Sequence, residues 1–226
     1  MTRLDPSSRN VLNRRHVEHF PGDALFARLA RAVCAAECLP RKELYEAWET
    51  ARRVRRRLRG GPVLEAAAGH GLLAAILVLL DDTTPRARCV DIVQPPSHAP
   101  LLAALTGVWP RLAGRIEYVV GRLEDEPVAG PDTLIASVHA CGTLTDAVLD
   151  KALAHRCPVA VLPCCHDLAA CDDGGLAGWL DGPLAVDATR AARLRAAGYR
   201  VWTSRIPAEI TPKNRLLVGW PDSATA

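Results

Sequence analysis

A loop of small residues between an apolar strand and an apolar helix carries the clearest chemical signal in the sequence. Residues 63–71 read VLEAAAGHG. Alanine and glycine at such a turn let a bound cofactor approach the backbone closely. Asp91 follows Gly71 by twenty residues, and a carboxylate in that place can accept hydrogen bonds from the two hydroxyls of a ribose. The pattern therefore predicts a cofactor that contains a nucleoside.

Two kinds of cofactor fit this loop. Gly69-x-Gly71-x-x-Ala74 satisfies the dinucleotide pattern in its Gly/Ala form, which favours an NAD(P)-dependent oxidoreductase. That pattern requires an apolar strand that runs straight into the first glycine, whereas Glu65 stands four residues before Gly69. An acid there, with Ala67 in the first glycine position, resembles the class I methyltransferases that use S-adenosyl-L-methionine. We therefore favour the methyltransferase and keep the oxidoreductase as an alternative.

The methyltransferase resemblance also implies which residues hold the cofactor. Glu65 attracts the cationic amino-acid end, and Asp91 binds the ribose. Glu124 is expected to face the adenine, because Arg122 occupies the usual acid position after the third strand. The complete predicted set of cofactor-binding residues is Glu65, Ala67, Gly69, His70, Gly71, Asp91, Glu124 and His139.

Histidine and cysteine follow two later strands that we expect to be neighbours. Residues 137–146 read SVHACGTLTD, and residues 162–167 read LPCCHD. Functional groups in a doubly wound sheet gather where the parallel strands end. We therefore predict a cluster beside the reacting methyl group, formed by His139, Cys141, Asp146, Cys165 and His166.

Three chemistries fit this cluster. An imidazole titrates near neutral pH, so His139, or as second choice His166, is predicted to be a general base that Asp146 orients. A cysteine can instead be a covalent nucleophile. Zinc is a third alternative, with ligands among Cys164, Cys165, His166 and Cys171, joined by His139 or Cys141. The Cys-Cys-His run is tighter than the usual ligand spacing, so we predict no metal.

The motif His-x-Cys-Gly-x-x-x-Asp followed by Pro-Cys-Cys-His resembles a particular methyltransferase family. That family includes the eukaryotic tRNA 2′-O-methyltransferases of the acceptor stem. Residues 212–215, PKNR, also match it, and the resemblance covers residues 60 to 220. It implies that Asn214 hydrogen-bonds the acceptor, which is an RNA, such as a tRNA ribose hydroxyl, or a small molecule. A non-catalytic zinc- or RNA-binding module is a further alternative.

The elements that position these residues follow from hydrophobic periodicity. Short apolar runs alternate with helical ones after Pro62, which predicts an α/β fold with a doubly wound, Rossmann-like sheet. No long helix separates the last two strands, so we expect them to be antiparallel. The predicted strands begin at Val63 and continue over 87–93, 116–120, 132–139, 158–163, 199–206 and 215–220. The predicted helices are 72–80, 101–109, 145–154 and 187–197.

Residues 1–60 are predicted to be a helical N-terminal cap, with helices over 22–38 and 41–58. Residues 61–221 form the catalytic domain, and residues 222–226 form a disordered tail. Six arginines between positions 52 and 59 are expected to contact phosphates or to form the solvated face of the second helix.

Composition limits the remaining possibilities. The 226 residues suffice for one α/β domain, and a net charge of +3 is too small to indicate DNA binding. The polar first ten residues and the lack of an apolar run of about 18 residues predict a cytoplasmic protein without a membrane partner. The eight cysteines are expected to be reduced thiols, with Cys34, Cys38, Cys89 and Cys157 in the core. The sequence leaves the oligomeric state open.

Overall fold

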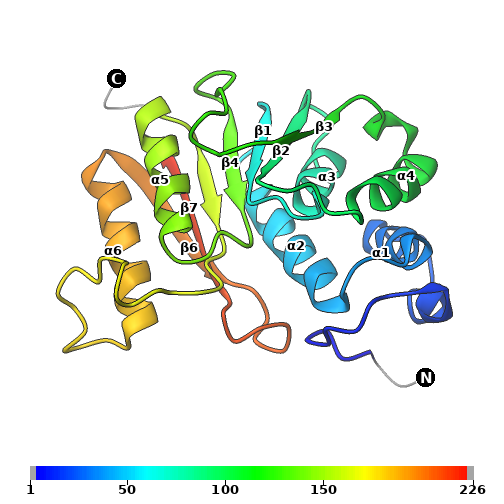
Figure 1. Ribbon diagram of the computed structural model, residues 1–226, viewed down its shortest axis with the longest axis horizontal. Helices are drawn as coiled ribbons and strands as arrows, with labels where there is room; N and C mark the ends of the chain where they lie inside the picture. The colour runs from blue at the N-terminus through cyan, green and yellow to red at the C-terminus, as the bar shows by residue number, and fades with distance from the viewer. Residues whose placement is uncertain (1–3, 223–226) are drawn as a thin grey trace.

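The short apolar runs after Pro62 form the strands of one sheet in the computed structural model, which describes residues 4–222 (Figure 1). Within these residues the sheet has seven strands in the order β3-β2-β1-β4-β5-β7-β6. The parallel strands are β1 (Val63–Ala66), β2 (Ala87–Asp91), β3 (Ile116–Val120), β4 (Leu134–Ser137) and β5 (Val159–Val161). Every residue of β1, β4 and β5 is buried, as expected for a parallel sheet that is covered on both faces.

The last two strands confirm the predicted antiparallel pair. β6 (Tyr199–Arg205) and β7 (Arg215–Pro221) pair over their full length, and β7 lies antiparallel to β5. The chain order reverses between β1 and β4, so the sheet is doubly wound. This arrangement is the Rossmann-like methyltransferase fold that the sequence predicts.

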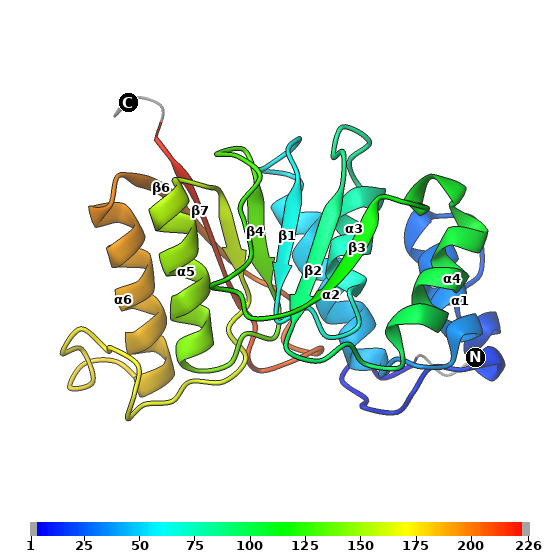
Figure 2. The same ribbon diagram turned by 45° about the horizontal axis from the view of Figure 1, so that its top comes forward.

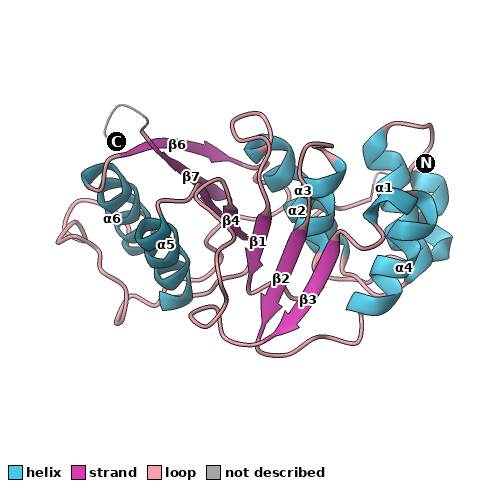
Figure 3. Cartoon of the chain, turned by 90° about the horizontal axis from the view of Figure 1, so that it is seen from above, coloured by secondary structure: helices cyan, strands magenta, loops and turns pink. Residues whose placement is uncertain are grey.

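Helices cover both faces of the sheet (Figures 2 and 3). Residues of α1 to α4 share one hydrophobic core with one face of the sheet, whereas the helices α5 and α6 pack on the other face. The α-helices are α1 (Leu25–Ala36), α2 (Arg41–Val54), α3 (Leu72–Leu79), α4 (His98–Val108), α5 (Thr143–His155) and α6 (Gly182–Ala196), and two short 3-10 helices are η1 (Arg14–His19) and η2 (Pro110–Leu112). No helix within residues 4–222 is long and apolar enough to cross a membrane.

The N-terminal helices predicted over 22–38 and 41–58 are present as α1 and α2. Leu44, Ala51 and Val54 of α2 belong to the same buried core as α3. This packing places α2 directly over the loop that begins α3, so the N-terminal segment contributes to the site described below.

Several predicted element boundaries are wrong. The helix predicted over 187–197 begins earlier, because the Asp181 side chain accepts a hydrogen bond from the backbone of Leu184 and Pro183 lies in the first turn. The strand predicted over 132–139 is limited to β4, because the chain turns beyond Ser137. The predicted tail falls largely on residues 223–226, outside the described part of the chain.

Two of the arginines that directly follow α2 have partners within the fold. Arg55 is buried, donates hydrogen bonds to the Leu77 carbonyl and the Thr84 hydroxyl, and lies 3.5 Å from the Asp81 carboxylate. Arg57 lies over the ring of Trp202, with 4.8 Å between the guanidinium carbon and the ring centre. The expectation of a solvated arginine face is therefore wrong for Arg55.

Candidate functional site

A pocket of about 360 Å³ lies where β1, β2 and β4 end. Six of the eight predicted cofactor-binding residues line it, and α2 adds two residues from outside the sheet. The lining includes Glu65, Ala67, Gly69, His70, Asp91 and His139, together with Glu43 and Ala47 of α2. The sequence motifs thus converge on one concave site.

The loop after β1 needs left-handed backbone at three positions. Ala67, Gly69 and Gly71 have φ angles of 50°, 48° and 77°. A Cβ on Gly71 would lie 3.0 Å from the Cys89 sulfur, whereas a Cβ on Gly69 would meet nothing within 4 Å. The absence of a side chain at Gly71 therefore allows close packing against Cys89, and Gly71 does not line the pocket. Gly69 lines the pocket and has open space beside it.

Glu65 is a buried acid at the base of the pocket. Its Oε2 accepts a hydrogen bond of 2.9 Å from the backbone N–H of Ala74, in the first turn of α3. Burial raises the pKa of this carboxyl from 4.5 to about 8, and the nearby charge of Asp91 adds to the rise, while the N–H groups of α3 and the thiol of Cys89 oppose it. The folded carboxyl therefore keeps its proton at neutral pH. A cation that enters the pocket would favour its ionised form.

Asp91 ends β2 on the pocket wall. Its Oδ2 accepts a hydrogen bond of 2.9 Å from the backbone N–H of Gly69, and its Oδ1 accepts one of 2.8 Å from the backbone N–H of Ile92. Each carboxylate oxygen can accept a second bond, so two ribose hydroxyls can still bind. The Tyr118 hydroxyl donates 2.8 Å to the Gly69 carbonyl and steadies the same loop. The sequence interpretation missed Tyr118, although it lies on the predicted third strand.

Glu43 is the pocket-lining residue that the sequence interpretation missed most clearly. It lies on α2, and its Oε2 is 3.0 Å from Nε2 of His70, whose Nδ1 contacts the Ser97 hydroxyl. Burial of Glu43 opposes ionisation, but the hydrogen bond with His70 and the charges of His70 and His139 lower its pKa overall. His70 therefore links α2 to the loop after β1.

The predicted histidine cluster divides into two groups. His139 is exposed and lines the pocket of Glu65 and Asp91. The His166 side chain is 4% exposed, and its Nε2 lies 2.8 Å from Asp187 of α6. The prediction that Asp146 orients an imidazole is wrong. Both Asp146 carboxylate oxygens instead accept hydrogen bonds from the buried Arg190, of 2.9 and 2.6 Å.

Two further predicted residues lie outside the pocket lining. Asn214 is buried, and its side-chain N–H donates 2.9 Å to the Ile206 carbonyl, so it closes the loop between β6 and β7. Glu124 is exposed and pairs with Arg122 at 3.3 Å, and its hydrogen bonds lower its pKa. Neither residue lines the pocket of Glu65 and Asp91.

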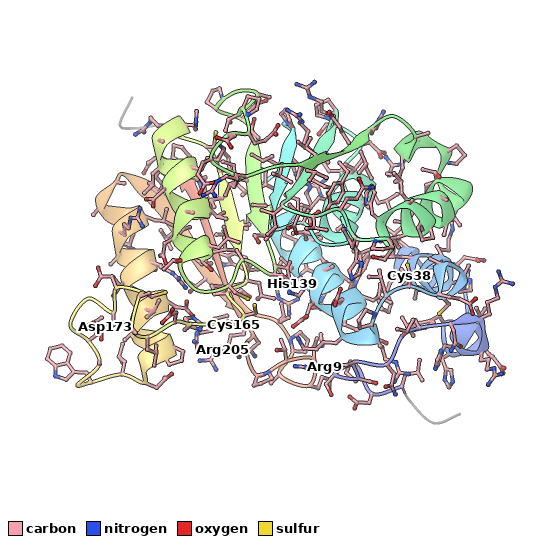
Figure 4. The ribbon with its side chains drawn as sticks, viewed as in Figure 1. Arg9, Cys38, His139, Cys165, Asp173 and Arg205 are labelled. Atoms are coloured by element: carbon pink, nitrogen blue, oxygen red, sulfur yellow. The ribbon has the colours of Figure 1, made fainter. Side chains whose placement is uncertain are left out.

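All eight cysteines are free in the structure. Cys34, Cys89 and Cys157 are buried, which confirms their expected core positions, and Cys38 is half-buried. Cys141, Cys164 and Cys165 come together at the ends of β4 and β5, with their sulfur atoms within 4.8 Å of one another. Figure 4 shows Cys165 and His139 at the same edge of the sheet.

A second pocket, of about 390 Å³, lies between α6 and the β6–β7 pair. Asp187, Arg205 and Arg215 give it charge, and Pro163 connects it with the cysteine segment. It contains none of the predicted cofactor-binding residues.

Comparisons with known proteins agree with this fold. A family model described as a methyltransferase domain matches residues 42–171. A protein of the O-methyltransferase family from Burkholderia thailandensis superposes with a TM-score of 0.50 at 18% identity, over 96% of this chain and 65% of its own. A Nostoc punctiforme protein described as an O-methyltransferase superposes with a TM-score of 0.50 at 16% identity, over 86% of this chain and 60% of its own. These likenesses support the fold alone. No curated protein sequence matches the chain.

Proposed function

The chain belongs to a family of methyltransferase domains, and on that premise we propose that it takes its methyl group from S-adenosyl-L-methionine. The observation that carries the proposal is the placement of Glu65 and Asp91 on the wall of one pocket of about 360 Å³. An acid for a cationic amine and an acid for ribose hydroxyls are the two groups that this cofactor requires. Family membership displaces the alternative of an NAD(P)-dependent oxidoreductase.

The residues of the pocket fit the cofactor in shape as well as in charge. Open space faces Gly69, and the small side chain of Ala67 lets a ligand approach the loop backbone. We assign the cationic amine to Glu65 and the ribose to Asp91. Glu43 adds a second carboxylate from α2, held by His70. S-adenosyl-L-methionine, when bound, supplies a methyl group on a sulfonium, which an acceptor can attack directly.

The protein's own contribution is then to position the acceptor and to take its proton. We propose His139 as the base for a hydroxyl acceptor, because its ring is exposed at the pocket. His166 is the weaker candidate, since its side chain is buried and Nε2 is bound to Asp187. Asp146 and Asn214 act on the architecture around the site rather than on the acceptor, given their bonds to Arg190 and Ile206.

An RNA ribose hydroxyl is the first acceptor that we propose to test, on the basis of the His139 and Cys164 motifs, and small molecules come second. Paired arginines in α2 leave little free positive charge there: Arg52 and Arg53 both contact Glu49, and Arg55 is buried. Arg56 and Arg59 are exposed and remain available to phosphates. A cytoplasmic location remains a prediction.

Calorimetric titration with S-adenosylhomocysteine, with NADH as the control ligand, tests the proposal. We expect binding of the first and none of the second. Binding of NADH alone would restore the oxidoreductase alternative. Binding of neither would leave a non-catalytic zinc- or RNA-binding module as the best account. If S-adenosylhomocysteine binds, transfer of radiolabelled methyl groups to total tRNA and to small-molecule pools identifies the acceptor class.

A further inference from the structure

The three thiols of Cys141, Cys164 and Cys165 form a group to which the proposed methyl transfer assigns no chemical step. Cys141 lies in the loop after β4, and the other two lie in the loop after β5. We propose that these three cysteines bind a zinc ion as thiolates and leave its fourth coordination position open to water. The site is independent of the cofactor proposal, because it shares no residue with the pocket of Glu65 and Asp91.

The spacing of the sulfur atoms suits zinc. Tetrahedral zinc with a Zn–S bond of about 2.3 Å places two sulfur ligands about 3.8 Å apart. The Sγ atoms of Cys164 and Cys165 are 3.8 Å apart, and those of Cys141 and Cys164 are 3.0 Å apart. All three lie within 4.8 Å of one another. Zinc binding would lengthen the distance between the Cys141 and Cys164 sulfur atoms by about 0.8 Å.

Backbone contacts hold the two cysteine loops in this arrangement. The Gly142 N–H donates a hydrogen bond of 3.0 Å to the Cys165 carbonyl. The Gly142 carbonyl accepts a hydrogen bond of 2.9 Å from the buried Arg190. Gly142 itself has φ 57° and ψ −130°, a conformation that residues with a Cβ rarely adopt. The backbone conformation of Gly142 and its hydrogen bonds therefore hold the two cysteine loops together before a metal binds. This reduces the conformational entropy that metal binding would cost.

Exposure argues against an ordinary packing role. Free cysteines are among the most buried residues of proteins. Cys141 and Cys165 are exposed and Cys164 is half-buried, whereas Cys34, Cys89 and Cys157 are in the core. Exposed thiols that lie close together contribute little hydrophobic burial. Metal binding would explain why these three lie together.

Charge also favours the ion. Three thiolates around Zn²⁺ carry a net charge of −1, and the Lys213 ammonium lies 3.5 Å from the Cys165 sulfur. Lys213 belongs to the same 212–215 segment whose function the methyl-transfer proposal leaves open. His166 and Cys171 are not in the ligand set, because His166 Nε2 binds Asp187 and the Cys171 sulfur lies 3.6 Å from Arg190.

Metal analysis of the purified full-length protein tests the site. The protein is expressed with zinc, purified under reducing conditions and analysed by mass spectrometry for bound metals. We expect one zinc ion per chain in the wild type and its loss in Cys141→Ser and Cys165→Ser. Cys38→Ser is the matched control, since this half-buried thiol lies outside the cluster and should retain the full zinc content.

Cobalt substitution gives a second readout that does not depend on activity. Co²⁺ in the wild type should show the intense absorption of thiolate-bound tetrahedral cobalt, and Cys141→Ser should lose it. Wild-type protein without zinc, copper in place of zinc, or equal zinc in all variants would overturn the proposal. Titration with S-adenosylhomocysteine on the same samples separates this outcome from failure of the cofactor site, because each can fail while the other holds.

Discussion

Glu65→Gln separates a buried structural acid from an acid that faces a cationic ligand. The substitution keeps a carbonyl oxygen to accept the Ala74 N–H, 2.9 Å away in the native protein, and removes the ability to ionise. The native carboxyl has a pKa raised from 4.5 to about 8, chiefly by burial. The variant therefore changes one property, the charge available at the base of the pocket.

The raised pKa fixes the direction of the effect on stability. Between pH 4.5 and about 8 the folded carboxyl keeps its proton, while the unfolded chain releases it. Stability from this group is complete below pH 4.5 and is lost as the pH rises to 8, by at most roughly 5 kcal/mol at about 1.4 kcal/mol per pH unit. Glu65→Gln should remove this pH dependence and unfold at a higher urea concentration than wild type at pH 8.

Ligand affinity should respond to pH in the opposite direction. A cationic amine beside Glu65 favours the ionised carboxylate, so binding at pH 6 to 7.5 releases a proton. Wild-type affinity for S-adenosylhomocysteine should then increase up to roughly tenfold per pH unit in this range. In Glu65→Gln the affinity should be flat with pH. It should also be lower by roughly 10- to 100-fold at pH 7.5, because a charge-assisted bond is lost.

Calorimetry in buffers of different ionisation enthalpy measures both the affinity and the released proton. Glu117→Gln is the control, since this carboxylate is largely exposed, pairs with Arg88 and lies outside the pocket lining. An unchanged pH slope in Glu65→Gln, or no proton release in the wild type, would refute the assignment of the cationic amine to Glu65. The stability prediction would survive that result, because it depends on the surroundings of Glu65 in the ligand-free protein and not on the cationic ligand.

Three further predictions follow from the geometry. His139→Ala should lower methyl transfer roughly 100-fold or more and leave S-adenosylhomocysteine affinity unchanged, and equal losses in both assays would contradict its role as a base. Gly71→Ala should cost about 2 to 4 kcal/mol of unfolding free energy in urea, because of its φ of 77° and the sulfur 3.0 Å from a new Cβ, whereas Gly69→Ala should cost about 1 kcal/mol. Arg55→Met should cost roughly 3 kcal/mol or more by leaving a buried carboxylate unpaired, while Arg56→Met at an exposed position should change stability by about 0.5 kcal/mol or less.

The geometry of the loop after β1 could be predicted because it is largely local. Glu65, Gly69 and Asp91 lie at the ends of adjacent strands, and strand–turn–helix sequences place such residues by backbone geometry alone. Glu43 could not be found in this way, because it reaches the pocket from a helix that precedes the sheet. Only the packing of α2 on α3, a tertiary contact, brings that carboxylate to His70.

For the histidine and cysteine motifs, the predicted topology gives the position of each residue in the sheet but not the partner of its side chain. The order of strands places residues 139–146 and 162–167 at one edge of the sheet, but it does not fix the direction of each side chain. Arg190 of α6 decides this for Asp146, because a buried guanidinium draws in the nearest carboxylates. Asp187 of the same helix binds His166. Neither partner stands in a motif, so neither could be anticipated from spacing.

The loop after β4 links the two parts of the site. His139 faces the cofactor pocket, and Cys141, two residues later, joins the thiols of the loop after β5. Gly142, next in sequence, carries the backbone bond between the two loops. A zinc ion on Cys141 would restrain the segment that presents His139, so the position of the base would depend on the metal although the ion touches neither base nor cofactor. Removal of zinc should then reduce methyl transfer more than it reduces S-adenosylhomocysteine binding, because Glu65 and Asp91 are held by β1, β2 and α3 instead.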